Sequence, residues 1–276
     1  MPNTGMSATV VAGVDESEAA LAAVRWAAEE ALRTGRRLLL FHAGIFDTAD
    51  LARHEHTKNS PVLLERAHRW IRRAVRVAEA TAPGVPVEYV VRVGLAPDLL
   101  VGLSAEAGLL VLGSHGIGGL RGVTIGSVAL RVAATARCPV VVARGRVKPD
   151  GPVVAGVDGD DRVLEFAFEA ARSRHVPLVA VHAWQAPRTG ELHAAEPREE
   201  QALRERVEHV AGRYGDVFVK SRLIRDRSAA HALMSVDDAQ LVVIGSRGRG
   251  PVAAGLFGST GNRLLAQSAC PVAIVH

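Results

Sequence analysis

Glycine and serine residues recur in one spacing at two places in the chain, and these residue types suit phosphate binding. The spacing is G-x2-G-x9-G-[ST], found at Gly113, Gly116, Gly126 and Ser127 and again at Gly245, Gly248, Gly258 and Ser259. Glycine lets the backbone approach an anion closely, and serine at a helix start can cap the helix or bond a phosphate oxygen. The pattern therefore predicts a phosphate-binding loop that is used twice.

The known phosphate-binding motifs do not describe these loops. The P-loop G-x4-G-K-[ST] is absent, and no lysine lies near either loop. The dinucleotide motif G-x-G-x-x-G fails in "GIGGLR" and in "GRGPVA", and the S-G-G-x-D-S pattern of ATP pyrophosphatases is missing after the first expected strand. The repeated spacing is thus a motif of a different kind.

An internal repeat explains why the motif occurs twice. "VVAGVDES" at 10–17 returns as "VVAGVDGD" at 153–160, and "LLVLGSHG" at 109–116 returns as "LVVIGSRG" at 241–248. The order of the matching segments is preserved, and the period is too long for a solenoid, so it suits duplicated domains. We expect one domain over residues 1–146 and a second over 151–276, joined by the basic segment "RGRVKPDGP".

The hydrophobic pattern of the first copy alternates between short strands and helices. Strands are expected at 9–14, 37–42, 86–93, 109–113 and 138–143, and helices at 16–34, 61–81, 96–106 and 127–136. Strands that are apolar on both faces and alternate with helices predict a doubly wound α/β fold with a five-stranded, mostly parallel sheet. Ligands of such sheets bind outside the carboxyl ends of the strands, where each glycine loop leads into a helix N-terminus.

The chain resembles the universal stress protein family, specifically its tandem-domain, ATP-binding branch. The resemblance is carried by "GVDES" and "GVDGD", by "FHA" and "VHA", by the glycine motif, and by "CPVVVA" and "CPVAIV". It covers about residues 8–143 and 152–276. It implies Rossmann-like domains of the adenine nucleotide alpha hydrolase type, and a protein in which nucleotide binding acts as a regulatory input.

The resemblance also assigns site residues, position by position. Asp15 and Asp158 would contact the adenosine moiety, and the backbones of Ala43 and Ala183, expected just after the second strand, would read the adenine edge. Gly13 and Gly156 open the two aspartate motifs and belong to the same site. Mg²⁺ bridging the phosphates is implied as well, although the sequence shows no carboxylate cage. The ribose–phosphate cradle would be formed by Gly113, Gly116, Gly126, Ser127 and Val128, and in the second copy by Gly245, Gly248, Gly258, Ser259 and Thr260.

Several of these residues have a plainer structural interpretation. Asp15 could cap the following helix, for which Ser17 is also suited. Asp160 stands where the first copy has Ser17, so its carboxylate would repel a triphosphate unless a metal or Arg247 intervenes. His42 and His182 are expected to be packed, hydrogen-bonded side chains rather than ligands. Cys138 and Cys270 are expected to be small, buried residues at strand starts without a disulfide.

Composition excludes some classes of function. The net charge is +4, but basic residues are dispersed and aromatic residues are few, so we expect no nucleic-acid partner. No apolar run is long enough to span a bilayer and the N-terminus does not look like a signal peptide, so we expect no membrane partner and a cytoplasmic location.

The expected function is that of an ATP-binding regulator of stress response or of growth and metabolic state. One alternative is a slow ATPase or self-phosphorylating enzyme. Another is a protein-interaction module whose nucleotide cradle is empty. No nucleophile–base pair recurs in both copies, so at most weak ATP hydrolysis is expected. Partners beyond an adenine nucleotide would be an unidentified protein and a second chain in a homodimer, for which the last strand of each copy is a candidate edge.

Overall fold

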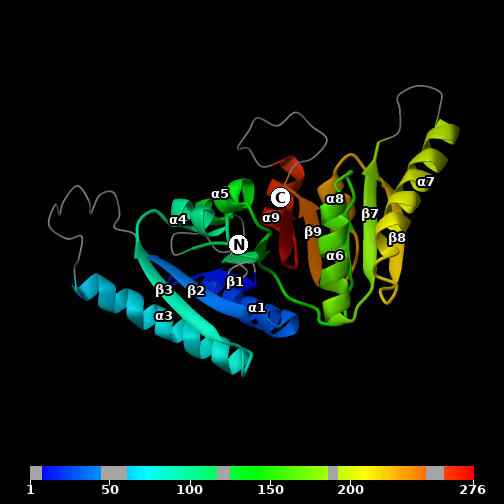
Figure 1. The fold of residues 1–276 in the computed structure, drawn as a ribbon. Coiled ribbons are helices and arrows are strands. Elements are labelled where there is room, and N and C mark those ends of the chain that lie inside the picture. The colour runs from blue at the N-terminus through cyan, green and yellow to red at the C-terminus, as the bar shows by residue number, and fades with distance from the viewer. Residues whose placement is uncertain (1–7, 45–60, 117–124, 186–191, 247–257) are drawn as a thin grey trace. The chain divides into compact units, whose positions relative to one another are not determined.

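The computed structural model describes residues 8–44, 61–116, 125–185, 192–246 and 258–276. The chain divides into two compact units, Met1–Arg144 and Gly145–His276. Each unit contains one copy of the sequence repeat, and Figure 1 shows its elements along the chain. In the described parts, no helix is long and apolar enough to cross a membrane.

The first unit is a five-stranded parallel sheet with the strand order β3-β2-β1-β4-β5. From β1 the chain continues to β2 and β3 on one side, and then to β4 and β5 on the other side. The carboxyl ends of β1 and β4 therefore lie side by side where the strand order reverses, which is the usual ligand-binding point of such a fold. Its elements are β1 (Thr9–Gly13), α1 (Glu18–Thr34), β2 (Arg37–Gly44), α3 (Pro61–Thr81), β3 (Val87–Val93), α4 (Ala96–Leu103), β4 (Leu109–Gly113), α5 (Ser127–Thr135) and β5 (Val140–Ala143).

The second unit repeats this topology, with five parallel strands in the order β8-β7-β6-β9-β10. The carboxyl ends of β6 and β9 are the counterparts of β1 and β4. The elements are β6 (Val153–Gly156), α6 (Asp161–Arg174), β7 (Leu178–Trp184), α7 (Leu192–Ala211), β8 (Val219–Arg225), α8 (Ala229–Met234), β9 (Leu241–Gly245), α9 (Ser259–Gln267) and β10 (Val272–Val275).

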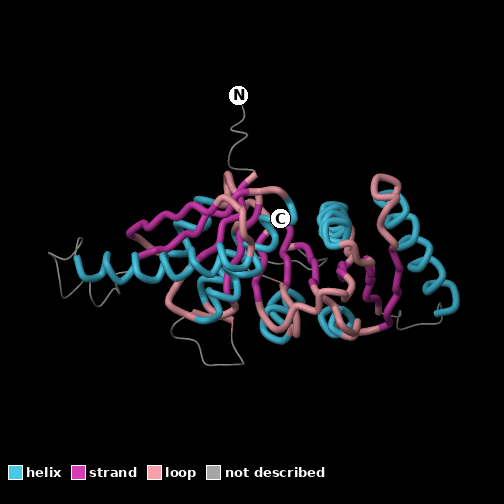
Figure 2. Tube along the Cα trace, turned by 90° about the horizontal axis from the view of Figure 1, so that it is seen from below, coloured by secondary structure: helices cyan, strands magenta, loops and turns pink. Residues whose placement is uncertain are grey.

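Helices cover both faces of each sheet. In the first unit, α1 packs beside α3 and α4 packs beside α5; in the second, α6 packs beside α7 and α8 beside α9. Figure 2 shows helices on both sides of the strands of the second unit. The central strands are therefore buried on both faces: Val10, Val11 and Ala12 of β1 have no exposed surface. This explains why these strands read as continuous apolar runs rather than as alternating patterns.

The ends of α1 show how local sequence fixes the elements. Ser17 is the N-cap, and its hydroxyl accepts a hydrogen bond from the N–H of Ala20 at 3.1 Å. Gly35 ends the helix in the left-handed region, with φ of 64°, and its N–H donates to carbonyl oxygens of the last turn. Glycine adopts this conformation without the steric cost of a Cβ atom.

The predicted fold class is confirmed. The predicted helix at 61–81 and the predicted strand at 109–113 match the observed bounds, while the other elements differ from their predicted bounds by one to three residues at one end. The strand β2 continues to Gly44, two residues beyond its predicted end, because its pairing with β3 persists to Gly44 and Val93. The helix α4 ends at Leu103, where the Ser104 hydroxyl bonds the carbonyl of Val101.

Candidate functional site

The turn after β1 brings Asp15 to the carboxyl edge of the first sheet. Oδ1 of Asp15 accepts hydrogen bonds from the N–H of Ser17 at 2.9 Å and from its hydroxyl at 2.5 Å. Ser17, not Asp15, bonds the backbone of the first turn of α1. The carboxylate of Asp15 is half-buried, and its second oxygen, Oδ2, faces Gly116: a Cβ atom on Gly116 would lie 2.6 Å from it. Asp15 therefore supports the turn and also lies against the glycine loop.

The glycine loop is tied to the start of α5 by backbone bonds. The N–H of Gly126 donates to the carbonyl of Ser114 at 2.8 Å, and Gly126 is the N-cap of the helix. Within the described residues no side chain caps this end. Ser127 is the first helical residue and is exposed, while Val128 is half-buried. The sequence allowed Ser127 to be the cap, but Gly126 takes that position. The first N–H groups of a helix have no intrahelical partner, so this end suits an anion.

Gly113 has a packing role. A Cβ atom there would lie 2.7 Å from the carbonyl carbon of Ala19 and 2.8 Å from its oxygen, both backbone atoms of α1. Glycine is thus needed so that α1 can pack closely over the end of β4. Gly13 is less constrained, because its nearest neighbour is the flexible end of the Leu112 side chain.

Ala43 lies inside β2, not after it as expected. Within a parallel strand, successive residues direct their N–H and C=O groups to opposite sides. The carbonyl of Phe41 points to the β1 side and accepts a hydrogen bond from the N–H of Val14 at 2.8 Å. This is the last hydrogen bond between β2 and the β1 segment. Ala43 directs its backbone to the same side, beyond the end of β1. The arrangement suits the predicted reading of a base edge by backbone groups. Ala183 has the same position in the second unit, two residues after Val181, which accepts from Val157.

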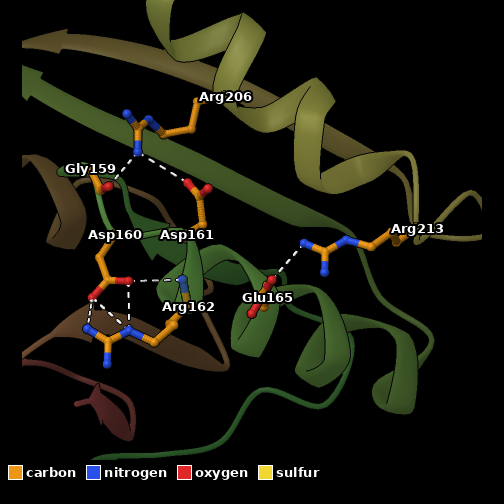
Figure 3. A network of polar contacts seen from close by, with 7 residues as sticks. All are labelled: Gly159, Asp160, Asp161, Arg162, Glu165, Arg206 and Arg213. Atoms are coloured by element: carbon orange, nitrogen blue, oxygen red, sulfur yellow. Dashed lines mark hydrogen bonds and ion pairs between the residues drawn. The ribbon is translucent and has the colours of Figure 1, made fainter.

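The second unit has a more highly charged turn at the same edge. Asp160 is the N-cap of α6, accepting from the N–H of Arg162 at 3.1 Å, and it also binds the guanidinium of Arg162. Nη2 of Arg162 lies 2.6 Å from Oδ2 of Asp160, and Figure 3 draws this contact. The hydrogen bonds from Arg162 lower the pKa of the Asp160 carboxyl from its ordinary value. The cation beside Asp160 is therefore Arg162. Arg247 lies outside the described residues, as does Gly248.

Arg206 of α7 also contacts this turn, and Arg213, just after α7, contacts α6. Nη1 of Arg206 donates to the carbonyl of Gly159 and, at 3.1 Å, to Asp161, and Arg213 pairs with Glu165 at 2.6 Å (Figure 3). The first unit makes equivalent connections from α3. Its pairs are Arg66 with Glu16, and Arg73 with Glu18.

The other predicted positions of the second unit occupy places equivalent to those in the first. Gly156 ends β6 and Gly245 ends β9, and Asp158 follows β6 as a half-buried residue. Gly258 is the N-cap of α9 without a side-chain cap among the described residues, and a Cβ atom there would meet nothing within 4 Å. Ser259 is exposed on the first turn of α9, and Thr260 beside it is half-buried.

His42, His182 and the two cysteines behave as structural residues. Nδ1 of His42 lies 2.8 Å from the carbonyl of Val14, and Nδ1 of His182 lies 2.7 Å from that of Val157, so both buried rings hold the turn after the first strand of their unit. Cys138 and Cys270 are free and buried, as predicted. In the described parts of the chain, no group of three or more His, Cys, Asp or Glu residues could hold a metal ion.

Two features of the site were not found from the sequence. The Ser17 hydroxyl also lies 3.3 Å from the carbonyl of His115, so it links the Asp15 turn to the glycine loop. The second feature is that Arg162 neutralises the charge of Asp160. The sequence "DDR" carried a signal for this contact, because a guanidinium two residues after an N-cap aspartate can reach back to it.

The fold defines a tandem α/β protein in which a glycine-rich segment leads from the carboxyl edge of each sheet into a helix. The universal stress protein family matches residues 6–144 and 152–276, and the chain belongs to that family. The chain is 33% identical over 298 residues to the universal stress protein Rv2623 of Mycobacterium tuberculosis, covering 100% of this chain and 99% of that protein. It is 34% identical over 285 residues to Rv2005c of the same organism, covering 97% and 96%.

A solved structure confirms the architecture. A universal stress protein from Archaeoglobus fulgidus superposes with a TM-score of 0.76 and covers 98% of both chains. Because its sequence identity is 20%, this similarity bears on the fold alone.

Proposed function

We propose that the protein binds an adenine nucleotide, ATP above all, in each unit and acts as a nucleotide-dependent regulator of stress response or metabolic state. The observation that carries the proposal is the convergence of three features in the first unit. The Asp15 carboxylate, the close-packed Gly116 and the start of α5, which no described side chain caps, all lie at the carboxyl edge of β1 and β4. This edge is where sheets of this kind bind ligands.

Each part of a nucleotide has a suitable counterpart in the first unit. The N-terminus of α5 and the Ser127 hydroxyl would hold phosphate oxygens, because the helix dipole and its first N–H groups favour an anion. Asp15 has one carboxylate oxygen bonded to Ser17, and the other is suited to accept from a ribose hydroxyl. The backbone of Ala43 would bond the base edge. Gly116 and Gly126 border this part of the edge, and neither carries a Cβ that would occupy space there.

We propose that Mg²⁺ binds to the protein together with the phosphates of the nucleotide. Magnesium keeps several waters and commonly binds through substrate phosphates with few protein ligands. The lack of a three-residue metal cluster among the described residues is compatible with that mode of binding. Mg²⁺ would neutralise phosphate charge next to Asp15.

The second unit would bind through α9 in the same way, with one difference. Asp160 takes the place of Ser17, but its charge is balanced by Arg162 at 2.6 Å. The repulsion expected between Asp160 and a triphosphate is therefore reduced. We propose that the second unit also binds nucleotide, with an affinity different from that of the first because its turn is more charged.

The experiment that tests the regulatory proposal separates binding from turnover. Purified protein would be denatured, and any released nucleotide identified by mass spectrometry. Nucleotide-stripped protein would then be incubated with Mg·ATP while phosphate release and incorporation of phosphate into the chain are measured. We expect bound adenine nucleotide with phosphate release far below one turnover per minute. Rapid hydrolysis or self-phosphorylation would favour the enzyme alternative, and no bound nucleotide with no binding would favour an interaction module.

A further inference from the structure

The outer strand β3 of the first unit has apolar side chains in contact with solvent. Among the described residues β3 pairs with β2 alone, so its other side carries backbone groups that no strand there satisfies. Tyr89 is 47% exposed and Val93 is 50% exposed, although both are large apolar residues in a strand. Figure 1 shows β3 at the outer side of the first sheet, next to α3. Such an edge is a template for pairing with another strand.

The backbone direction of each β3 residue follows from the bonds at its two ends. Pro86 accepts from the N–H of Leu38, and Gly94 donates to the carbonyl of Gly44, so both direct their backbone toward β2. Successive residues of a parallel strand alternate in direction. Tyr89 and the other odd-numbered residues of β3 therefore direct their N–H and C=O groups outward.

We propose that β3 pairs antiparallel with β3 of a second copy of this chain, around a two-fold axis at Val90. This register joins the outward-facing odd residues to one another, as backbone hydrogen bonding requires. It also places Glu88 opposite Arg92 of the other copy, and Arg92 opposite its Glu88. Both side chains are exposed, with 62% of the Glu88 side chain accessible. On the other face of the sheet, the register pairs Tyr89 with Val91, and Val87 with Val93.

Registers shifted by two residues lose this complementarity. An axis at Tyr89 would pair Glu88 with Val90, and an axis at Val91 would pair Arg92 with Val90. Cross-strand pairs of opposite charge stabilise a sheet, and apolar pairs do so as well. The axis at Val90 is thus the one that matches both the charges and the backbone direction. The occupant it fits is the identical strand, because a two-fold interface is self-complementary.

The equivalent strand of the second unit provides a contrast. β8 also pairs with one described neighbour, β7. It carries Lys220, Arg222 and Arg225, and no acidic residue. An antiparallel pair of two β8 strands would bring cations together, which is a common way to protect an edge. The two outer strands therefore differ in the property on which self-pairing depends.

The neighbouring helix does not oppose the pairing by charge. His68 of α3 lies edge-on to the Tyr89 ring, at 6.5 Å between centroids, so its flank of α3 borders β3. The helical spacing places Arg72, Val75 and Glu79 on that same flank. One cation and one anion give this flank no net charge from those residues. These three positions therefore add no net charge beside the axis.

A single cysteine at the axis tests the register directly. Val90 of one copy would face Val90 of the other, and directly opposed residues of antiparallel strands lie close enough for a disulfide. Val93→Cys is the matched control, because in this register two residues 93 lie about 20 Å apart at roughly 3.3 Å per residue. The native cysteines are buried and so contribute little background. Under mild oxidation we expect disulfide-linked dimers of Val90→Cys and few of Val93→Cys. Equal cross-linking of both variants, or none, would overturn the proposed register.

Charge exchange tests the interaction without cysteines. Sedimentation velocity would be measured up to roughly 0.5 mM, because a pair of single strands forms a small, weak interface. Glu88→Arg and Arg92→Glu should each weaken dimerisation at least several-fold by opposing like charges, and the double variant should recover most of it. Glu88 also pairs with Arg37 at 3.6 Å, so thermal unfolding of each variant checks that the unit is intact. A chain that stays monomeric, or a double variant no better than the single ones, would contradict the proposal. Nucleotide is absent throughout, so the outcome is independent of the proposed function.

Discussion

Oδ2 of Asp15 lies 2.6 Å from the position that a Cβ atom would take on Gly116. These residues belong to different segments, the turn after β1 and the loop after β4, and their contact assembles the candidate site of the first unit. Ser17 adds to this assembly, because it bonds Asp15 and reaches the carbonyl of His115. The acidic turn and the start of the glycine loop, at His115 and Gly116, are therefore held together.

Gly116→Ala should lower nucleotide affinity in the first unit. The added methyl group would collide with the Asp15 carboxylate and displace it from both Ser17 and the ligand. Loss of one charge-assisted hydrogen bond corresponds to about 1.5–3 kcal/mol, or roughly 10- to 100-fold in Kd. Titration calorimetry with Mg·ATP measures this change.

Gly102→Ala is the matched control. Gly102 is an exposed residue of α4, and a Cβ atom there would meet nothing within 4 Å. Alanine should stabilise the helix by about 0.5–1 kcal/mol and leave nucleotide binding unchanged. Equal Kd values for Gly116→Ala and the wild type would show that Asp15 does not take part in binding.

Gly113→Ala should destabilise the first unit rather than affect the ligand directly. Its Cβ would lie 2.7 Å from backbone of α1, which cannot move aside as a side-chain end can. Overpacking of this kind typically costs about 1–3 kcal/mol. Chemical denaturation followed by circular dichroism would show an earlier transition. A variant as stable as the wild type would mean that α1 can shift without cost.

The sequence predicted the architecture because the repeat and the apolar runs are strong signals. Strands buried on both faces, such as β1 and β4, leave uninterrupted valine and leucine runs that alternate with helical segments. The glycine motif placed the loop correctly at a strand end and a helix start. The role of Gly113 was less accessible, because its close neighbour Ala19 is distant in sequence and only the packing of α1 reveals it.

Asp160 should make the stability of the second unit depend on pH. Arg162 lowers the pKa of the Asp160 carboxyl, so the stabilisation is complete above the ordinary carboxyl value near 4 and is lost as the pH falls through the lowered folded value. Asp160→Asn keeps an N-cap side chain but removes the charge. The difference in unfolding free energy between wild type and variant should be present at pH 7 and should shrink toward pH 3. A difference that is constant with pH would exclude the ion pair as its cause.

Cys138 should be unreactive in the folded protein. Burial raises the pKa of its thiol to about 12, and the thiolate is the nucleophile, so almost none is present at pH 8. Iodoacetamide followed by mass spectrometry should find Cys138 unmodified in native protein and modified after denaturation. Rapid native alkylation would show that this strand start opens readily.

Charged partners of the site residues were difficult to predict from the sequence. A metal or Arg247 was expected to offset the charge of Asp160; Arg247 lies outside the described residues, and among the described ones Arg162 binds Asp160 from the first turn of α6. The pairs that join α3 and α7 to the first turns depend on how helices pack side by side, as with Arg66 and Glu16. Such contacts between separate elements leave no periodic signal in the chain.

Titration calorimetry of nucleotide-stripped protein with Mg·ATP would show directly whether each unit binds nucleotide. The cradle variants are Gly126→Leu and Gly258→Leu: both glycines have extended backbones that any residue can adopt, so leucine fills space without backbone strain. We expect two sites in the wild type, one in each single variant and none in the double variant, with circular dichroism spectra unchanged. Unaltered binding in the double variant, or no binding in the wild type, would contradict the proposed function.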